Sequence, residues 1–219
     1  MIRNVILDFG NVIGSFDAQA LMRQFCEDDA DRHLLKQAIF HNWTALDAGQ
    51  TAYADYIAQT LDRLPERLHE TAQTYFRDWY RHLTYVDGMP ELIADLKEQG
   101  VPLYLLSNAP VYFSQHLDFF DVLQGFSGIV VSGDLQMVKP EAGIYIYLLE
   151  KYALVPEESL FIDDMEENVE AARKCGLQGY RFDGDTEKLR WRLSPLLSGG
   201  KPGSLPVCKD ALNVLLKST

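Results

Sequence analysis

The fold is decided by a stretch near the N-terminus, Val5-Ile6-Leu7-Asp8-Phe9-Gly10-Asn11-Val12-Ile13. Residues 2–7 form a β-rich run that stops at Asp8, and the chain then turns through Gly10. Further short apolar runs, each expected to be a strand, follow at 101–106, 128–132, 160–162 and 179–182. Helices are expected between and after them, at 89–99, 110–119, 140–152, 165–175 and 185–193. This alternation predicts an α/β fold, a Rossmann-like parallel sheet with helices on both faces.

The segment that follows the first strand has a different pattern, because helix follows helix without strands between. Helices are expected at 17–26, 29–40, 51–64 and 65–81. The last of these carries one apolar stripe at helical spacing, formed by Leu68, Ala72, Tyr75, Phe76 and Trp79. We therefore predict a core formed by residues 1–13 and 86–193, with a helical bundle inserted over 14–85.

The C-terminal segment, residues 194–219, differs from both. Residues 194–204 contain eight Ser, Gly or Pro residues in eleven, which is the composition of a flexible linker. Beyond the linker, apolar residues at helical spacing predict a short C-terminal helix: Cys208, Leu212, Leu215 and Leu216.

The charge balance limits the possible partners. Twenty Lys and Arg against thirty-two Asp and Glu give a net charge of −12, so nucleic acid and anionic membranes are poor partners. An anionic substrate would need a local cation. No apolar run approaches the roughly 18 residues of a membrane span, and the N-terminus lacks the layout of a signal peptide. The three cysteines form no CxxC pair, so we expect reduced thiols in a cytoplasmic protein, a monomer or a homodimer.

Polar residues follow the predicted strands at the points where each strand ends. In a doubly wound sheet, ligands bind at the carboxyl ends of the strands. Any one of these residues could simply cap a helix or form a turn. Their joint appearance at strand ends is hard to obtain by chance, and it marks the candidate site: Asp8, Ser107, Asn108, Lys139, Asp163 and Asp164.

Four segments that contain these residues resemble the four motifs of the haloacid dehalogenase superfamily. They are residues 5–13, 105–108, 138–145 and 161–169. The resemblance covers about residues 1–190, and the inserted helices lie where that family has a small C1-type cap. It implies a Mg²⁺-dependent phosphatase that acts on small phosphorylated metabolites, most of all sugar phosphates, through an aspartyl-phosphate intermediate.

The resemblance also implies a role for each residue. Asp8 would be the nucleophile, and Lys139 would neutralise the nucleophile and the phosphate. Mg²⁺ prefers hard oxygen ligands, which Asp8, Asp164 and the backbone carbonyl of Gly10 would supply, and Asp163 would ligate the ion directly or orient its waters. The phosphate would be bound by Ser107, Asn108 and Lys139, with Gly10 and Asn11 beside it.

One residue departs from the pattern of most phosphatases in this superfamily. They place a general acid–base Asp two residues after the nucleophile, where this chain has Gly10. Three interpretations stay open. Another acid could replace it, with Asp17 the nearest in sequence, or an ordered water could do so. The substrate could be one with a good leaving group, such as an anomeric sugar phosphate. The Asp-x-Gly-Asn pattern resembles a bacterial glucose-1-phosphate phosphatase-like subgroup, which favours this second interpretation. The protein could also be a weakened relative.

Two alternatives to a phosphatase are considered. True dehalogenases of the superfamily also lack the second Asp, but they use no metal and have no adjacent acidic pair in the fourth motif. A non-catalytic binding or regulatory relative would have no need for a nucleophile beside a metal site.

Within the inserted helices, four residues could line the mouth of the site or pack in the bundle core: His41, Trp43, Tyr53 and Tyr56.

Overall fold

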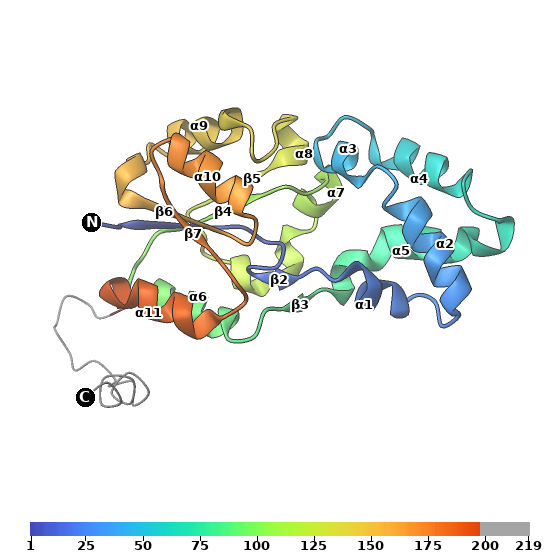
Figure 1. Cartoon of the computed structure of the whole chain (residues 1–219), viewed down its shortest axis with the longest axis horizontal. Helices are drawn as coiled ribbons and strands as arrows, with labels where there is room; N and C mark the ends of the chain where they lie inside the picture. Colours follow the sequence, from blue (N-terminus) through green and yellow to red (C-terminus); the bar gives the residue numbers. More distant parts are fainter. Residues whose placement is uncertain (198–219) are drawn as a thin grey trace, which may run out of the picture.

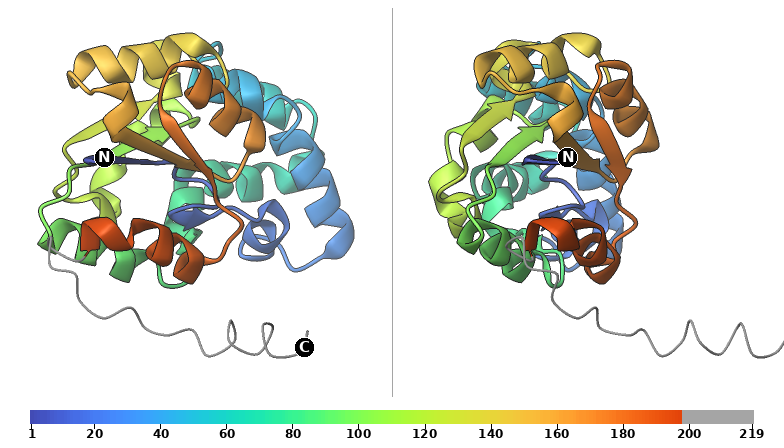
Figure 2. Two further views of the ribbon diagram at one scale, coloured as in Figure 1. Left: turned by 60° about the vertical axis from the view of Figure 1, so that its left-hand side comes forward. Right: turned by 90° about the vertical axis from the view of Figure 1, so that its left-hand side faces the viewer.

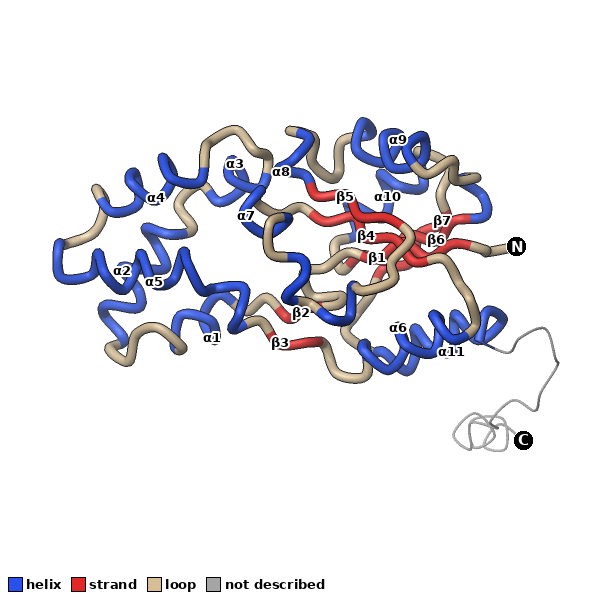
Figure 3. Tube along the Cα trace, turned by 180° about the vertical axis from the view of Figure 1, so that it is seen from behind, coloured by secondary structure: helices blue, strands red, loops and turns tan. Residues whose placement is uncertain are grey.

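The computed structural model describes residues 1–197, and its centre is a five-stranded sheet. The strand order is β5-β4-β1-β6-β7, and all neighbouring strands are parallel (Figures 1 and 3). The strands are β1 (Asn4–Leu7), β4 (Leu103–Ser107), β5 (Gly128–Val131), β6 (Ser159–Asp163) and β7 (Gln178–Arg181). The α/β prediction is confirmed.

Helices cover both faces of this sheet (Figures 1 and 2). On one face lie α9 (Ala142–Lys151) and α10 (Glu166–Lys174), and on the other lie α6 (Met89–Glu98) and α11 (Thr186–Leu197). Successive side chains of a strand point to opposite faces. Val5 and Leu7 therefore join the apolar cluster that contains residues of α6 and α11, whereas Ile6 joins the cluster that contains residues of α9. A strand buried on both faces reads as a continuous apolar run.

The inserted helices lie together at one end of the molecule (Figure 1). They are α1 (Ala18–Arg23), α2 (Asp29–Ile39), α3 (Trp43–Asp47), α4 (Tyr53–Leu61) and α5 (His69–Asp78), and we call them the helical block. The single helix predicted over 65–81 is α5 flanked by two 3₁₀ turns, Glu66–Leu68 and Trp79–His82. All five residues of its predicted apolar stripe are buried. The boundaries between core and cap stay a prediction.

Two short strands join the helical block to the sheet. β2 (Gly14–Ser15) and β3 (Thr84–Tyr85) pair antiparallel, with Gly14 opposite Tyr85 (Figure 3). Neither strand was predicted, because two residues show no periodicity and each strand depends on a distant partner. The two crossings between core and helical block are therefore held side by side.

The segment after β4 differs from its prediction. Instead of one helix over 110–119, α7 (Val111–Ser114) is followed by 3₁₀ turns at Leu117–Phe119 and Asp121–Leu123. The rings of Phe113 and Phe120 each lie 4.8 Å from that of Phe9, and 5.4 Å from each other. Seven residues of helix would separate them by about 10 Å along its axis, so contact with one buried ring requires tighter turns.

Three further differences lie in the C-terminal half of the chain. A short helix that was not predicted, α8 (Ser132–Leu135), follows β5, and a 3₁₀ turn over Pro156–Glu158 precedes β6. Helix α11 continues through Pro195 to Leu197, so residues 194–197 are helical and not part of a linker. The rest of the predicted linker and the predicted C-terminal helix lie outside the described residues. Within residues 1–197, no helix is both long and apolar enough to cross a membrane.

Two glycines at the exit from β1 give a matched test of this packing. A Cβ added at Gly14 would lie 2.4 Å from the buried Phe9 ring, whereas one added at Gly10 would meet nothing within 4 Å. We expect Gly14→Ala to lower the free energy of unfolding by about 1–3 kcal/mol, as overpacked core residues do. Gly10→Ala should change it by no more than about 0.5 kcal/mol. Urea unfolding of both variants measures this, and equal effects would contradict the packing described for Phe9.

Candidate functional site

The pairing of the strands brings the candidate residues together. Leu7 of β1 is paired with Leu105 of β4 on one side and with Ile162 of β6 on the other. The next residue, Asp8, donates its backbone N–H to the carbonyl of Ile162 at 2.9 Å. Since parallel strands end at the same edge, the residues that end β1, β4 and β6 meet there, as the sequence predicted.

Lys139 lies between two of these carboxylates. Its Nζ is 2.8 Å from Oδ1 of Asp8 and 2.7 Å from Oδ2 of Asp163, and its side chain is 1% exposed. Burial alone would lower the pKa of Lys139, but the charges of Asp8 and Asp163 outweigh burial, and the pKa is raised. The lysine is therefore a fixed, buried cation at the edge of the sheet.

Asp8 is buried and holds its proton more tightly than an ordinary Asp. Burial raises the pKa of its carboxyl to about 6, against the charge of Lys139, while the charge of Asp163 adds to the rise. Its Oδ1 also accepts a hydrogen bond from the backbone N–H of Phe9 at 2.7 Å. Among the described residues, the hydrogen bonds and ion pairs of its side chain all fall on Oδ1, which leaves Oδ2 for a ligand.

The two adjacent acids of β6 have different surroundings. Asp163 is fully buried: Oδ2 binds Lys139, and Oδ1 accepts from the Met165 N–H at 2.8 Å and from Asn168 Nδ2 at 3.0 Å. Asp164 lies at the pocket wall and accepts from Asn11 Nδ2 at 3.2 Å. Burial raises the pKa of Asp164, which the bond from Asn11 partly offsets, and Asp163 raises it further. Asp163 is thus committed to protein donors, and Asp164 is the better placed to meet a ligand.

Asn108 holds the backbone of Lys139. Its Oδ1 accepts the Lys139 N–H at 2.9 Å, and its Nδ2 donates to the Lys139 carbonyl at 2.9 Å. The amide of Asn108 thus positions the backbone of Lys139. Its Nδ2 carries a second hydrogen, so the direct bond to phosphate suggested by the sequence stays a prediction. Ser107, one residue earlier, is buried at the end of β4, and it also lines the pocket.

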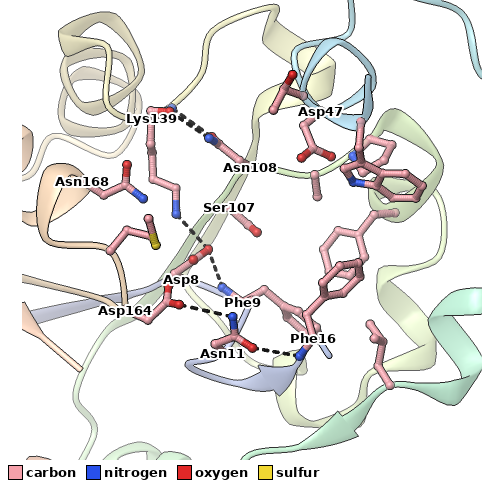
Figure 4. A pocket seen from close by; sticks show the side chains of 18 of the residues that line it. Asp8, Phe9, Asn11, Phe16, Asp47, Ser107, Asn108, Lys139, Asp164 and Asn168 are labelled. Carbon is pink, nitrogen blue, oxygen red and sulfur yellow. Dashed lines mark hydrogen bonds and ion pairs between the residues drawn. The ribbon is translucent and has the colours of Figure 1, made fainter. Parts of the chain in front are cut away.

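Asn11 and Gly10 form the turn after Asp8. Asn11 has a left-handed backbone, with φ of 54°, and its side chain joins Asp164 to the backbone N–H of Phe16 (Figure 4). Gly10 lines the pocket beside it. Asn11 therefore links the acidic pair to the segment that enters the helical block.

Asp17, proposed from sequence as the nearest replacement acid, is placed elsewhere. Its Oδ1 caps α1 by accepting the N–H groups of Gln19 at 2.8 Å and Ala20 at 3.2 Å. These hydrogen bonds lower its pKa, which is the wrong direction for a proton donor at neutral pH. Among the described residues, those that line the pocket do not include Asp17.

These groups open into one pocket of about 400 Å³ between the sheet edge and the helical block (Figure 4). Its far wall is aromatic and apolar, with Phe16, Trp43 and Trp79 beside Leu83 and Phe113. Of the residues proposed for the mouth, Trp43 lines the pocket. His41 is exposed, and Tyr56 is buried in the block with its hydroxyl on the Ile39 carbonyl. Tyr53 stacks on Tyr112 with ring centroids 4.3 Å apart.

Sequence reasoning missed two charged groups that line this pocket, the exposed Glu167 of α10 and Asp47. Asp47 lies at the end of α3. Burial raises the pKa of Asp47 well above the ordinary value, and the charge of Asp8 adds to the rise. An interaction with the Trp43 side chain and the charge of Lys139 act in the opposite direction. The sequence marked Asp47 only as a break between helices, because an Asp before Ala-Gly is typical of a turn. Nothing local distinguishes it from the exposed acids nearby.

The acidic groups fit a divalent metal ion. One carboxylate oxygen from each of Asp8, Asp163 and Asp164 lies within 4.8 Å of the others. Lys139 is the cation in contact with Asp8 and Asp163, so three carboxylates share a single lysine. Hard oxygen donors at this spacing suit Mg²⁺, and Asp8 and Asp164 have ligand-facing positions. Burial is the main cause of the raised pKa of Asp8 and Asp164, and a divalent ion would offset the charge of Asp163, which adds to the rise.

The chain resembles known proteins both in its sequence and in its fold. The chain is 24% identical over 211 residues to D-ribitol-5-phosphate phosphatase of Bacteroides thetaiotaomicron, covering 88% of this chain and 96% of that protein. It is 30% identical over 118 residues to a phosphoglycolate phosphatase of Pseudomonas putida, but it spans less than half of that protein's length, 43%. A similar fold occurs in a HAD family enzyme of Bacteroides thetaiotaomicron that was crystallised with magnesium and inorganic phosphate. The TM-score is 0.64 and the sequence identity is 22%, and the match covers 86% of this chain and 99% of the other.

The family match covers most of the chain. Residues 21–180 match the family described as haloacid dehalogenase-like hydrolase. That range includes α2 to α5 and part of α1, together with β4, Lys139 and the acidic pair at the end of β6. In the structure, Asp8 follows β1, which lies between β4 and β6. The chain belongs to the haloacid dehalogenase-like hydrolase family.

Proposed function

We propose that this protein is a Mg²⁺-dependent phosphatase that hydrolyses small phosphorylated metabolites, sugar phosphates above all, through an aspartyl-phosphate on Asp8. The observation that carries the proposal is the buried Lys139 held between Asp8 and Asp163, with Asp164 beside them. In a chain of net charge −12, this is the local cation that an anionic substrate needs.

In the proposed mechanism, the carboxylate of Asp8 attacks phosphorus and the ester oxygen leaves. Water then attacks the aspartyl-phosphate and releases inorganic phosphate. Lys139 stabilises charge on Asp8 and on the phosphoryl oxygens, and the Ser107 hydroxyl donates to one of those oxygens. Asn108 and Asp163 hold Lys139 in place from its backbone and its ammonium group. Mg²⁺, when bound by Asp8, Asp164 and the Gly10 carbonyl, would supply further positive charge.

The pocket supports a small substrate. Its volume of about 400 Å³ lies at the lower end of the range for small-molecule sites. The aromatic wall formed by Phe16, Trp43 and Trp79 comes from the helical block or from the segment leading into it, so residues 14–85 would act as a cap that chooses the substrate. A cap over the site also excludes water and large phosphoproteins.

The relatives support the same activity. Both sequence relatives named above are phosphatases, and the structural neighbour was crystallised with magnesium and inorganic phosphate. Dehalogenation is disfavoured by the charge of the site, because without a metal ion Asp164 would add a further negative charge beside two carboxylates that already share one lysine. A purely binding role would leave the geometry of Asp8 and Lys139 without a use.

Phosphate release tests the proposal directly. We expect turnover of a panel of sugar 1-phosphates and 6-phosphates with Mg²⁺, and its loss in EDTA. Asp8→Asn should lower kcat by at least about a thousandfold, because it removes the nucleophile. Asp55→Asn makes the same charge change at an exposed position in α4 and should leave kcat unchanged. Turnover that persists in EDTA would point to metal-independent chemistry, and folded protein without any turnover would contradict the proposal.

The raised pKa of Asp8 predicts a pH-dependent stability. The folded chain binds this proton more tightly than the unfolded chain, with a pKa of about 6 against 3.8. The resulting stabilisation is complete below pH 3.8 and is lost as the pH rises through 6. In EDTA, Asp8→Asn should therefore unfold at higher urea than wild type at pH 8, by about 2–3 kcal/mol.

The same comparison at pH 4 supplies the control. Asp8 is then protonated in the folded state, and the difference between Asp8→Asn and wild type should nearly vanish. Adding Mg²⁺ at pH 8 should stabilise wild type more than the variant, because ligand binding favours the folded state. A difference of the same size at both pH values would show that burial does not raise the pKa of Asp8.

A further inference from the structure

Two carboxyl groups that line the pocket have no role described so far, the exposed Glu167 and the more enclosed Asp47. Asp47 enters the pocket from the helical block, whereas Asp8 and Lys139 lie at the sheet edge (Figure 4). Within residues 1–197, its Oδ1 is buried and has no hydrogen-bond partner. A buried polar atom without a partner is costly, and at a pocket wall it indicates an atom that meets a ligand.

The core fixes the backbone on both sides of this carboxyl. The hydroxyl of Ser132, the first residue of α8, donates to the Asp47 carbonyl at 2.5 Å. Gln136 Nε2 donates to the Gly49 carbonyl at 3.2 Å. Gly49 has φ of 64°, and a Cβ added there would lie 2.3 Å from the Gly133 carbonyl oxygen, so the two backbones touch. Asp47 thus belongs to the helical block but is positioned by residues that follow β5.

The surroundings of Asp47 keep it protonated more readily than an ordinary Asp. Burial and the charge of Asp8 raise its pKa, while Trp43 and Lys139 lower it, and the net shift is upward. A carboxyl with a raised pKa can donate a proton near neutral pH, as a general acid must. The family position for that acid is occupied by Gly10, which has no side chain to offer.

We infer that Asp47 is the general acid–base of this site, supplied by the helical block in place of the residue missing at Gly10. The inference rests on the proposed phosphatase function. As Asp8 bonds to phosphorus and the ester P–O bond breaks, the Asp47 carboxyl gives its proton to the leaving oxygen. The Asp47 carboxylate then takes a proton from the attacking water, whose oxygen bonds to phosphorus as the Asp8–phosphorus bond breaks. The ester and one water become an alcohol and phosphate, and both aspartates are restored.

The dependence on the leaving group tests this role. Asp47→Asn keeps the shape of the side chain but cannot carry the proton. A poor leaving group, the alkoxide of glucose 6-phosphate, needs the proton, whereas the nitrophenolate of p-nitrophenyl phosphate does not. We expect kcat/KM of Asp47→Asn to fall by about 10²–10⁴-fold with glucose 6-phosphate, and by less than about tenfold with p-nitrophenyl phosphate. The loss should fall mainly on kcat.

Asp17→Asn is the matched control, because Asn caps a helix as well as Asp and the charge change is the same. It should leave both substrates unaffected. Three results for Asp47→Asn would overturn the inference while leaving the phosphatase proposal intact. They are an equal loss of kcat/KM on the two substrates, a change confined to KM, and no loss of kcat/KM. Wild type that hydrolyses neither ester with Mg²⁺ would overturn both. If Asp47→Asn loses the circular dichroism of the folded protein, Asp47→Ala is subjected to the same comparison.

Discussion

The ammonium group of Lys139, held between Asp8 and Asp163, is the interaction on which the site depends. It joins the ends of two adjacent strands, β1 and β6, to the loop that follows α8. Removing Lys139 would leave two buried carboxylates without the cation that both contact, whereas Asp8→Asn leaves Lys139 paired with Asp163. The surrounding groups are arranged around it: Asn108 binds the Lys139 backbone, and Asn168 and the Met165 N–H fill the remaining positions on Asp163.

This arrangement separates the three neighbouring acids into different tasks. Asp163 accepts hydrogen bonds from Lys139, the Met165 N–H and Asn168, so it orients the lysine, and its role toward a metal ion stays a prediction. Asp8 keeps one oxygen away from Lys139, and Asp164 faces the pocket with one contact from Asn11. Adjacent residues in sequence thus acquire unlike roles, since successive residues at the end of a strand point to opposite sides. Three carboxylates and one lysine leave an excess of negative charge, which explains why a divalent cation fits this site.

The sequence predicts those parts of the structure that have local causes. Four of the five strands of the sheet appear as short apolar runs, whereas β7 contains Gln178 and Arg181. The polar residues at the strand ends follow from the geometry of parallel sheets. The contacts of those residues could not be predicted in the same way. The contact of Asn108 with the Lys139 backbone depends on where the loop after α8 passes, which no local pattern encodes. The pairing of β2 with β3 and the shortening of α7 against the Phe9 ring also depend on distant segments.

Asp47 shows most clearly why the remainder could not be read from sequence. Its position depends on the Ser132 hydroxyl and on the contact between Gly49 and Gly133, both of which join the helical block to the core. On the proposed mechanism, the nucleophile and its lysine belong to the core, while the proton donor belongs to the helical block. The set of reacting groups is then complete only when the block is docked on the core as it is here. Because the acid belongs to the helical block and not to the loop after β1, proton transfer to the leaving oxygen would be coupled to docking of the block over the substrate.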